Sequence, residues 1–132
     1  MTARVVSPTG NDTTGNGSEG APYATVNKAA SLSTSGDEII VRGVLANQVA
    51  TISGTYSTSN PLIIRPHDVD GGQLDGTWTY PTGAAVGSGP NGDFVYGGLA
   101  SLTGTGIKWQ VPITRSRGRG ISIAGSYITI QN

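Results

Sequence analysis

The sequence predicts an all-β chain whose short strands form either a sandwich or a coil of stacked rungs. Thr, Ile and Val, whose branched side chains suit a pleated sheet, make up 37 of the 132 residues. The 21 glycines, together with Asn and Asp, divide these residues into short runs separated by turn signals. The first strand-like runs begin about 11 to 13 residues apart, which fits both architectures.

Residues 1–36 are predicted to form an N-terminal loop and a capping helix. Residues 7–20 are almost entirely turn formers, which indicates a surface loop. From Pro22 onward, an apolar face with helical spacing predicts a short helix of about ten residues, and this face comprises Val26, Ala29, Ala30 and Leu32. So short a helix needs an apolar surface to lie on.

Short strands are predicted for most of the remaining chain, within a single domain. They are 38–42, 49–52, 62–65, 73–74, 109–114, 121–123 and 127–130. Residues 37–76 would form the first rungs, 77–106 a loop excursion rich in Pro and Gly, and 107–132 further rung strands. A coil is favoured over a sandwich because Asn-Gly hairpin signals flanked by strands are scarce, and because a leading helix can cover the open end of a coil.

Composition excludes several function classes. The 8 Lys and Arg balance the 8 Asp and Glu, so no net charge favours a nucleic acid or a membrane surface as a partner. No apolar run approaches the roughly 20 residues of a membrane helix. The chain has no Cys, so disulfides and thiolate chemistry are excluded. The start of the chain leads into the strand-like Val5-Val6 and not into the apolar region of a signal peptide.

Three segments carry a resemblance to a known fold family. They are Val5-Val6-Ser7-Pro8-Thr9-Gly10-Asn11-Asp12, Ala21-Pro22-Tyr23-Ala24-Thr25-Val26-Asn27-Lys28-Ala29-Ala30 and Gly36-Asp37-Glu38-Ile39-Ile40-Val41-Arg42-Gly43. In this order they resemble the opening of proteins of the pectate-lyase-like superfamily, especially polysaccharide lyase families 9 and 6. Asn60-Pro61-Leu62-Ile63-Ile64-Arg65-Pro66 and residues 121–131 extend the resemblance, which covers 4–76 and 120–132.

The resemblance implies a short or truncated right-handed parallel β-helix of two to three rungs, belonging to a secreted or cell-surface protein that acts on acidic polysaccharide. It further implies a lyase that cuts by β-elimination, with calcium as the one cofactor suggested. No catalytic residue carries over, because the lysine base and calcium aspartates of family 9 have no matching stretch here. The alternatives are a non-catalytic carbohydrate-binding or attachment module, as in tail spikes and surface adhesins, and a structural oligomer.

Four basic residues are candidates for binding the carboxylates of such a polysaccharide. Lys108, Arg115, Arg117 and Arg119 are half of the chain's 8 basic residues and lie close together with no acid between them. In an extended backbone, alternation points the three arginines to one face, where guanidinium groups suit carboxylates or phosphates. The alternative interpretation is a solvated loop whose like charges keep a sheet edge soluble.

Aromatic residues suggest a second element of sugar recognition. Trp78 and Trp109 are the candidates, within a group that also holds Tyr80, Phe94 and Tyr96. Exposed rings stack on the apolar faces of sugars. Alternatively, these rings fill a small core within the loop excursion.

Two clusters offer oxygen or imidazole groups. The first is His67, Asp68, Asp70 and Asp75, which could serve acid/base chemistry or calcium but which Asp-Gly turns explain more simply. The second comprises Asn11, Asp12, Asn16 and Glu19, which lack the spacing of a calcium loop.

The last strand-like run of the sequence, Tyr127–Asn132, presents an apolar edge. This edge predicts self-association, cover by a loop, or continuation of the coil.

Overall fold

The computed structural model describes residues 1–46, 50–75, 100–111, 113–114, 121–123 and 125–130. Its strands are β1 (Ala3–Val6), β2 (Glu38–Val41), β3 (Gly43–Ala46), β4 (Ala50–Ile52), β5 (Leu62–Pro66), β6 (Gly72–Asp75), β7 (Ala100–Leu102), β8 (Thr105–Trp109), β9 (Ile113–Thr114), β10 (Ile121–Ile123) and β11 (Ser126–Ile130). The helix is α1 (Val26–Ser31). The prediction of an all-β chain is confirmed.

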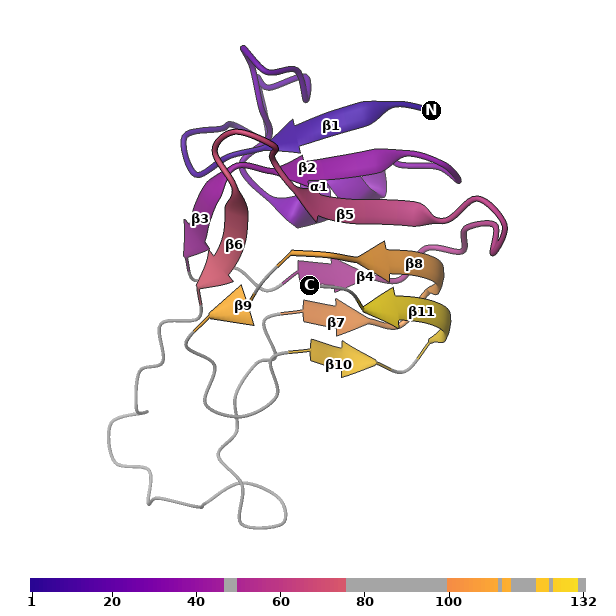
Figure 1. Ribbon diagram of the computed structural model, residues 1–132. Coiled ribbons are helices and arrows are strands. Elements are labelled where there is room, and N and C mark those ends of the chain that lie inside the picture. The colour runs from indigo at the N-terminus through magenta and orange to yellow at the C-terminus, as the bar shows by residue number, and fades with distance from the viewer. Residues whose placement is uncertain (47–49, 76–99, 112, 115–120, 124, 131–132) are drawn as a thin grey trace, which may run out of the picture.

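The strands form three parallel sheets that the chain visits in a fixed order (Figure 1). The first sheet has the order β1-β2-β5-β8-β11, the second β3-β6-β9 and the third β10-β7-β4. After β2, the chain passes to the second sheet, then to the third, and returns beside its starting point as β5; it repeats this circuit twice more. Each circuit therefore stacks on the one before it.

Strand alternation produces the core. In the first sheet, Ile39, Ile64, Trp109 and Ile130 are aligned across neighbouring strands, and the first three are at most 1% exposed. The neighbouring inward column contains Leu62 and Ile107, which are also buried. Residues between these columns face outward, so one sheet has an apolar inner face and a partly solvated outer face.

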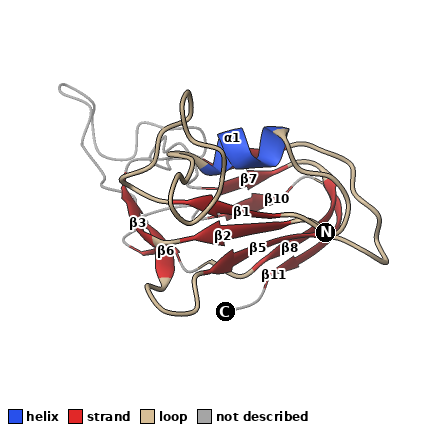
Figure 2. Cartoon of the chain, turned by 90° about the horizontal axis from the view of Figure 1, so that it is seen from above, coloured by secondary structure: helices blue, strands red, loops and turns tan. Residues whose placement is uncertain are grey.

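The N-terminal segment makes hydrogen bonds and packing contacts with the first circuit of strands. The outer edge of β1 bonds to the loop, since Val5 N–H donates to Gly17 O and Tyr23 N–H to Val5 O. The helix α1 packs against β1, β2 and β4. Figure 2 shows α1 lying along one side of the strands. The side-chain oxygen of Asn27 accepts the backbone N–H of Thr51 at 2.7 Å, which satisfies a donor on the edge strand β4.

The sequence-based boundaries of α1 need correction. The helix has six residues rather than about ten, because Thr25 is its N-cap and accepts the N–H of Lys28 at 3.1 Å. Leu32 is the C-cap and is 43% exposed, so it does not belong to the buried face that Val26, Ala29 and Ala30 form.

Three strands also differ from the prediction. Trp109 ends β8 and does not begin a strand reaching residue 114. The strand β7 lies within the segment 77–106 that was predicted as a loop excursion. The strand β3 was not predicted, because Gly43 was interpreted only as a turn signal. Gly43 has a φ of +64°, which provides the bend, and it is also the first residue of β3.

Stacked glycines form the turn that leads from the third sheet to the first. A Cβ on Gly104 would lie 2.0 Å from Gly54 O, and a Cβ on Gly125 would lie 1.8 Å from Gly104 O. Pairing of Thr105 with both Thr55 and Ser126 continues the stack. Only glycine allows backbones to approach so closely at these positions.

We expect Gly104→Ala to lower the free energy of unfolding by about 1–3 kcal/mol, because the new methyl group must push two stacked turns apart. Thermal unfolding measures the effect. Gly20→Ala is the control, since nothing lies within 4 Å of a Cβ at Gly20. Equal melting temperatures for the two variants would contradict the glycine stack.

Candidate functional site

The outer face of the first sheet carries a row of aligned side chains. Glu38, Ile63, Lys108 and Thr129 are in register from β2 to β11. Lys108 is partly exposed, and within the described residues its ammonium group has no hydrogen bond or ion pair. It is therefore a cation on this face that no described acid neutralises.

Arg65 lies on the same outer face and already has acidic partners. Its Nε donates to Glu38 Oε2 at 3.1 Å, and its NH1 donates to Asp68 Oδ1 at 3.2 Å. Alternation along the chain places Arg65 and His67, on either side of Pro66, toward the same side of the sheet. Arg65, Glu38 and Asp68 thus form one polar cluster on the outer face. A second polar cluster, which includes His67, lies next to it.

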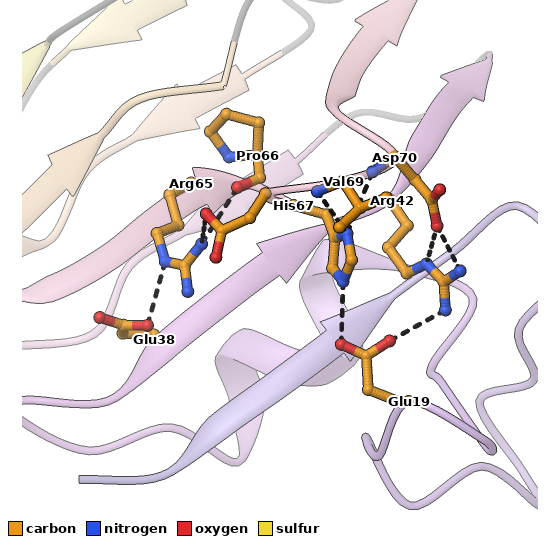
Figure 3. A network of polar contacts seen from close by, with 9 residues as sticks. Glu19, Glu38, Arg42, Arg65, Pro66, His67, Val69 and Asp70 are labelled. Atoms are coloured by element: carbon orange, nitrogen blue, oxygen red, sulfur yellow. Dashed lines mark hydrogen bonds and ion pairs between the residues drawn. The ribbon is translucent and has the colours of Figure 1, made fainter.

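This second cluster joins three separate segments of the chain (Figure 3). Glu19 comes from the N-terminal loop, Arg42 follows β2, and His67 and Asp70 belong to the turn after β5. Glu19 Oε1 lies 2.9 Å from His67 Nε2, and Glu19 Oε2 accepts from Arg42 NH1 at 2.9 Å. Arg42 Nε donates to Asp70 Oδ2 at 2.9 Å, and its NH2 donates to the same oxygen.

Backbone contacts determine the tautomer of His67. Its Nδ1 accepts the N–H groups of Val69 and Asp70, both at 3.2 Å, so this nitrogen carries no proton. The proton is then on Nε2, which donates to Glu19. Both ring nitrogens are engaged, and the imidazole acts as a fixed donor toward Glu19.

Asp68 and Asp70, two acids of the cluster predicted around His67, have different partners. Asp68 binds Arg65, whereas Asp70 binds Arg42. The predicted turn is present, since the backbones of His67 and Gly71 bond to each other. It is the His67 ring, however, and not an Asp carboxylate, that accepts the N–H groups of this turn.

The oxygen groups of the N-terminal loop are also occupied by protein donors. Asn11 Oδ1 accepts from Thr13 N–H and Thr14 N–H, and Asn16 Oδ1 accepts from Ser18 N–H. Asp12 accepts from Ala24 N–H and from the N–H and hydroxyl of Thr25. Burial alone raises the pKa of Asp12, but these hydrogen bonds and nearby Lys28 outweigh it and lower the pKa. The carboxylate of Asp12 thereby positions Thr25, the N-cap of α1.

A calcium ion needs several oxygen ligands directed at one point. The described residues contain no group of three or more His, Asp or Glu side chains that could hold a metal ion. Calcium binding stays a prediction from the resemblance.

The predicted substrate-binding residues have different outcomes. Lys108 lies on the partly solvated outer face, and its role in binding stays a prediction. Trp109 is 1% exposed and its Nε1 donates to Val111 O at 2.7 Å, so its ring belongs to the main core and presents no face for a sugar. Trp78, Arg115, Arg117 and Arg119 lie outside the described residues, and their role stays a prediction.

Sequence reasoning missed Arg42 and Arg65 as members of polar clusters. The signal for Arg65 was available, because in an alternating strand it follows the buried Ile64 and must face outward. No local signal links Arg42 to Glu19, since that contact depends on how the N-terminal loop returns to β2.

Comparison with known proteins supports the fold. No family model matches the chain, and no curated protein matches it. A solved structure described as a rhamnogalacturonan lyase is similar over 84% of this chain, with a TM-score of 0.56 and 15% sequence identity. The chain spans 28% of the length of that protein. Among the described residues, no helix has the length and apolar character needed to cross a membrane.

Proposed function

We propose that this chain is part of a carbohydrate-active, right-handed parallel β-helix protein that acts on an acidic polysaccharide outside the cell or at its surface. The observation that carries the proposal is the structural likeness to a rhamnogalacturonan lyase over 84% of the chain. The repeated circuit through three parallel sheets supports a β-helix. The contacts of α1 with β1, β2 and β4 support its role as the cap of this coil.

Substrate binding is assigned to the outer face of the first sheet. Lys108 supplies a cation that is not neutralised by a described acid, and an ammonium group is an ordinary partner for a sugar carboxylate. The stretch containing Arg115, Arg117 and Arg119 is proposed to add guanidinium groups, as the sequence predicts.

The proposed reaction of the whole protein is β-elimination. A cation neutralises the uronate carboxylate, and a base removes the proton from C5. The C5–H electron pair forms the C4–C5 double bond as the glycosidic oxygen leaves C4. Among the described residues, Lys108 suits the neutralising role, and we assign no base.

Binding to immobilised polymers tests the substrate class and the role of Lys108. We expect Lys108→Gln to weaken retention on pectate about three- to fivefold, the effect of losing one exposed ion pair of ~1 kcal/mol. Lys28→Gln is the matched control, because it removes the same charge from α1. Equal retention of the two variants would contradict the assignment of Lys108.

Parallel assays separate catalysis from attachment. Pectate, alginate and chondroitin are offered with and without calcium, and the ultraviolet absorbance of unsaturated uronate is followed. Turnover would support a lyase, whereas retention without turnover would support an attachment module. If no acidic polymer is retained or cleaved, the proposed substrate class is wrong.

Self-association through β11 is a separate proposal. Within the described residues, β8 pairs with one edge of β11 and no strand pairs with the other. Tyr127 and Ile130 beside this edge are 74% and 42% exposed. We propose that a strand from a second copy of the chain can pair there.

A further inference from the structure

The carboxylate of Glu19 is held by two donors from different parts of the chain. One of its oxygens accepts from Arg42 NH1 and the other is 2.9 Å from the protonated Nε2 of His67. A guanidinium and an imidazole directed at the two oxygens of one carboxylate are a complete recognition arrangement for that group. Figure 3 shows the three side chains converging.

The two donors are positioned without the help of Glu19. Asp70 binds the Nε and NH2 groups of Arg42, which leaves NH1 directed at Glu19. The backbone N–H groups of Val69 and Asp70 hold the His67 ring through Nδ1. The His67 side chain is only 16% exposed, which further limits its rotation. The arrangement would therefore persist if the Glu19 carboxylate left.

Glu19 is the least embedded member of the group. Its side chain is 60% exposed, against 31% for Arg42. It lies in a loop of turn residues, between Ser18 and Gly20, and not in a strand. Exposed ion pairs of this kind contribute little to stability, so a competing carboxylate can replace Glu19 at small cost.

We propose that Arg42 and His67 form a binding seat for the carboxylate of an acidic sugar, and that Glu19 occupies this seat until the ligand displaces it. The choice of an acidic sugar rests on the proposed function. The seat lies on the same side of β5 as Arg65, on the face that also carries Lys108. A polymer lying along this face would place one carboxylate in the seat and a later one near Lys108.

Removing Glu19 tests the seat. Glu19→Ala leaves Arg42 and His67 without their internal partner, and we expect galacturonate to bind this variant about three- to tenfold more tightly than it binds the wild type, since no competitor must leave. His67 is the single histidine of the chain, so its ring signals in NMR spectra report on the seat without ambiguity. Galacturonate should shift these signals saturably, whereas neutral galactose should not.

Two further variants keep the test specific. Glu38→Ala is the matched control, because it frees Arg65 from a carboxylate on the same face but outside the seat. In the Glu19→Ala background, Arg42→Gln should abolish the gain, and Arg42→Lys should retain part of it because the charge remains. Melting curves establish that each variant is folded.

The outcomes separate this inference from the proposed function. If galacturonate moves the His67 signals but no acidic polymer is retained, the seat is supported and the proposed function fails. If pectate is retained equally by the wild type, Glu19→Ala and Arg42→Gln, the seat is overturned and the proposed function stands. An unchanged galacturonate affinity in Glu19→Ala would also overturn the seat.

Discussion

Replacing Trp109 by alanine is expected to lower the free energy of unfolding by about 3–5 kcal/mol. The indole is 1% exposed and lies in register between Ile64 and Ile130 on the inner face of the first sheet. Its removal leaves a large cavity in a core that consists of few side chains per circuit, and the loss of its N–H leaves Val111 O without this donor. Denaturant unfolding of the purified variant measures the change.

Two comparison variants separate the contributions to this loss. Trp109→Phe retains an aromatic ring but loses the hydrogen bond to Val111 O, so its effect should fall between those of wild type and alanine. Val69→Ala also truncates an apolar side chain, yet Val69 is 85% exposed and should change stability by less than about 0.5 kcal/mol. Similar effects for Trp109→Ala and Val69→Ala would contradict the placement of the indole in the core.

The strand that ends at Trp109 shows why the sequence predicts the existence of strands better than their first and last residues. Runs of β-branched residues predict β2 (Glu38–Val41) and β5 (Leu62–Pro66) directly. By contrast, Thr105–Trp109 contains Gly106, which local rules interpret as a turn residue. Gly106 lies there with a φ of +71°, and a Cβ at this position would be 2.5 Å from Tyr56 O. Its place in a strand depends on contact with the preceding circuit, which no short window contains.

The polar clusters were predictable only in part, for a related reason. The alternation Ile107-Lys108-Trp109 is a local signal that places Lys108 on an outer face, but the sequence prediction began this strand only at Trp109. The contact of Glu19 with Arg42 and His67 joins positions far apart in sequence, and only the return of the N-terminal loop to β2 brings them together. The same holds for the contacts of Asp37 with Thr2 and Arg4, which lie more than 30 positions earlier in the chain, whereas its third partner, Thr34, is close in sequence.

Asp37 is a buried charge that joins the N-terminal segment to the start of β2. Its carboxylate accepts from Thr2 N–H at 2.9 Å, from Arg4 NH1 at 2.7 Å and from Thr34 N–H at 2.8 Å. Burial by itself raises the pKa of Asp37, but the N–H groups of Thr34 and Thr2 and the Arg4 guanidinium outweigh burial and lower the pKa to about 2. The group therefore ties β1 and the segment after α1 to the start of β2.

Asp37→Asn is expected to destabilise the fold by about 3–5 kcal/mol, because the charge of Arg4, whose side chain is only 16% exposed, loses its partner. The pH dependence identifies the cause. Between the ordinary Asp pKa of 3.8 and the folded value of about 2, the unfolded chain binds more protons at this residue than the folded chain does. Stability from Asp37 is thus present above about pH 4 and is lost as the pH falls toward 2, by about 2 kcal/mol in total.

Unfolding measured from pH 5 to pH 2 distinguishes this charge from simple packing. The wild type should lose stability steeply over this interval, and Asp37→Asn should lose about 2 kcal/mol less, since an amide does not titrate. Asp12, whose pKa is also lowered, adds a loss in the same direction and remains in both proteins, so it cancels in the comparison. Parallel pH profiles for the two proteins would mean that Asp37 holds the N-terminal segment to β2 through its shape and hydrogen bonds alone, and not through its charge.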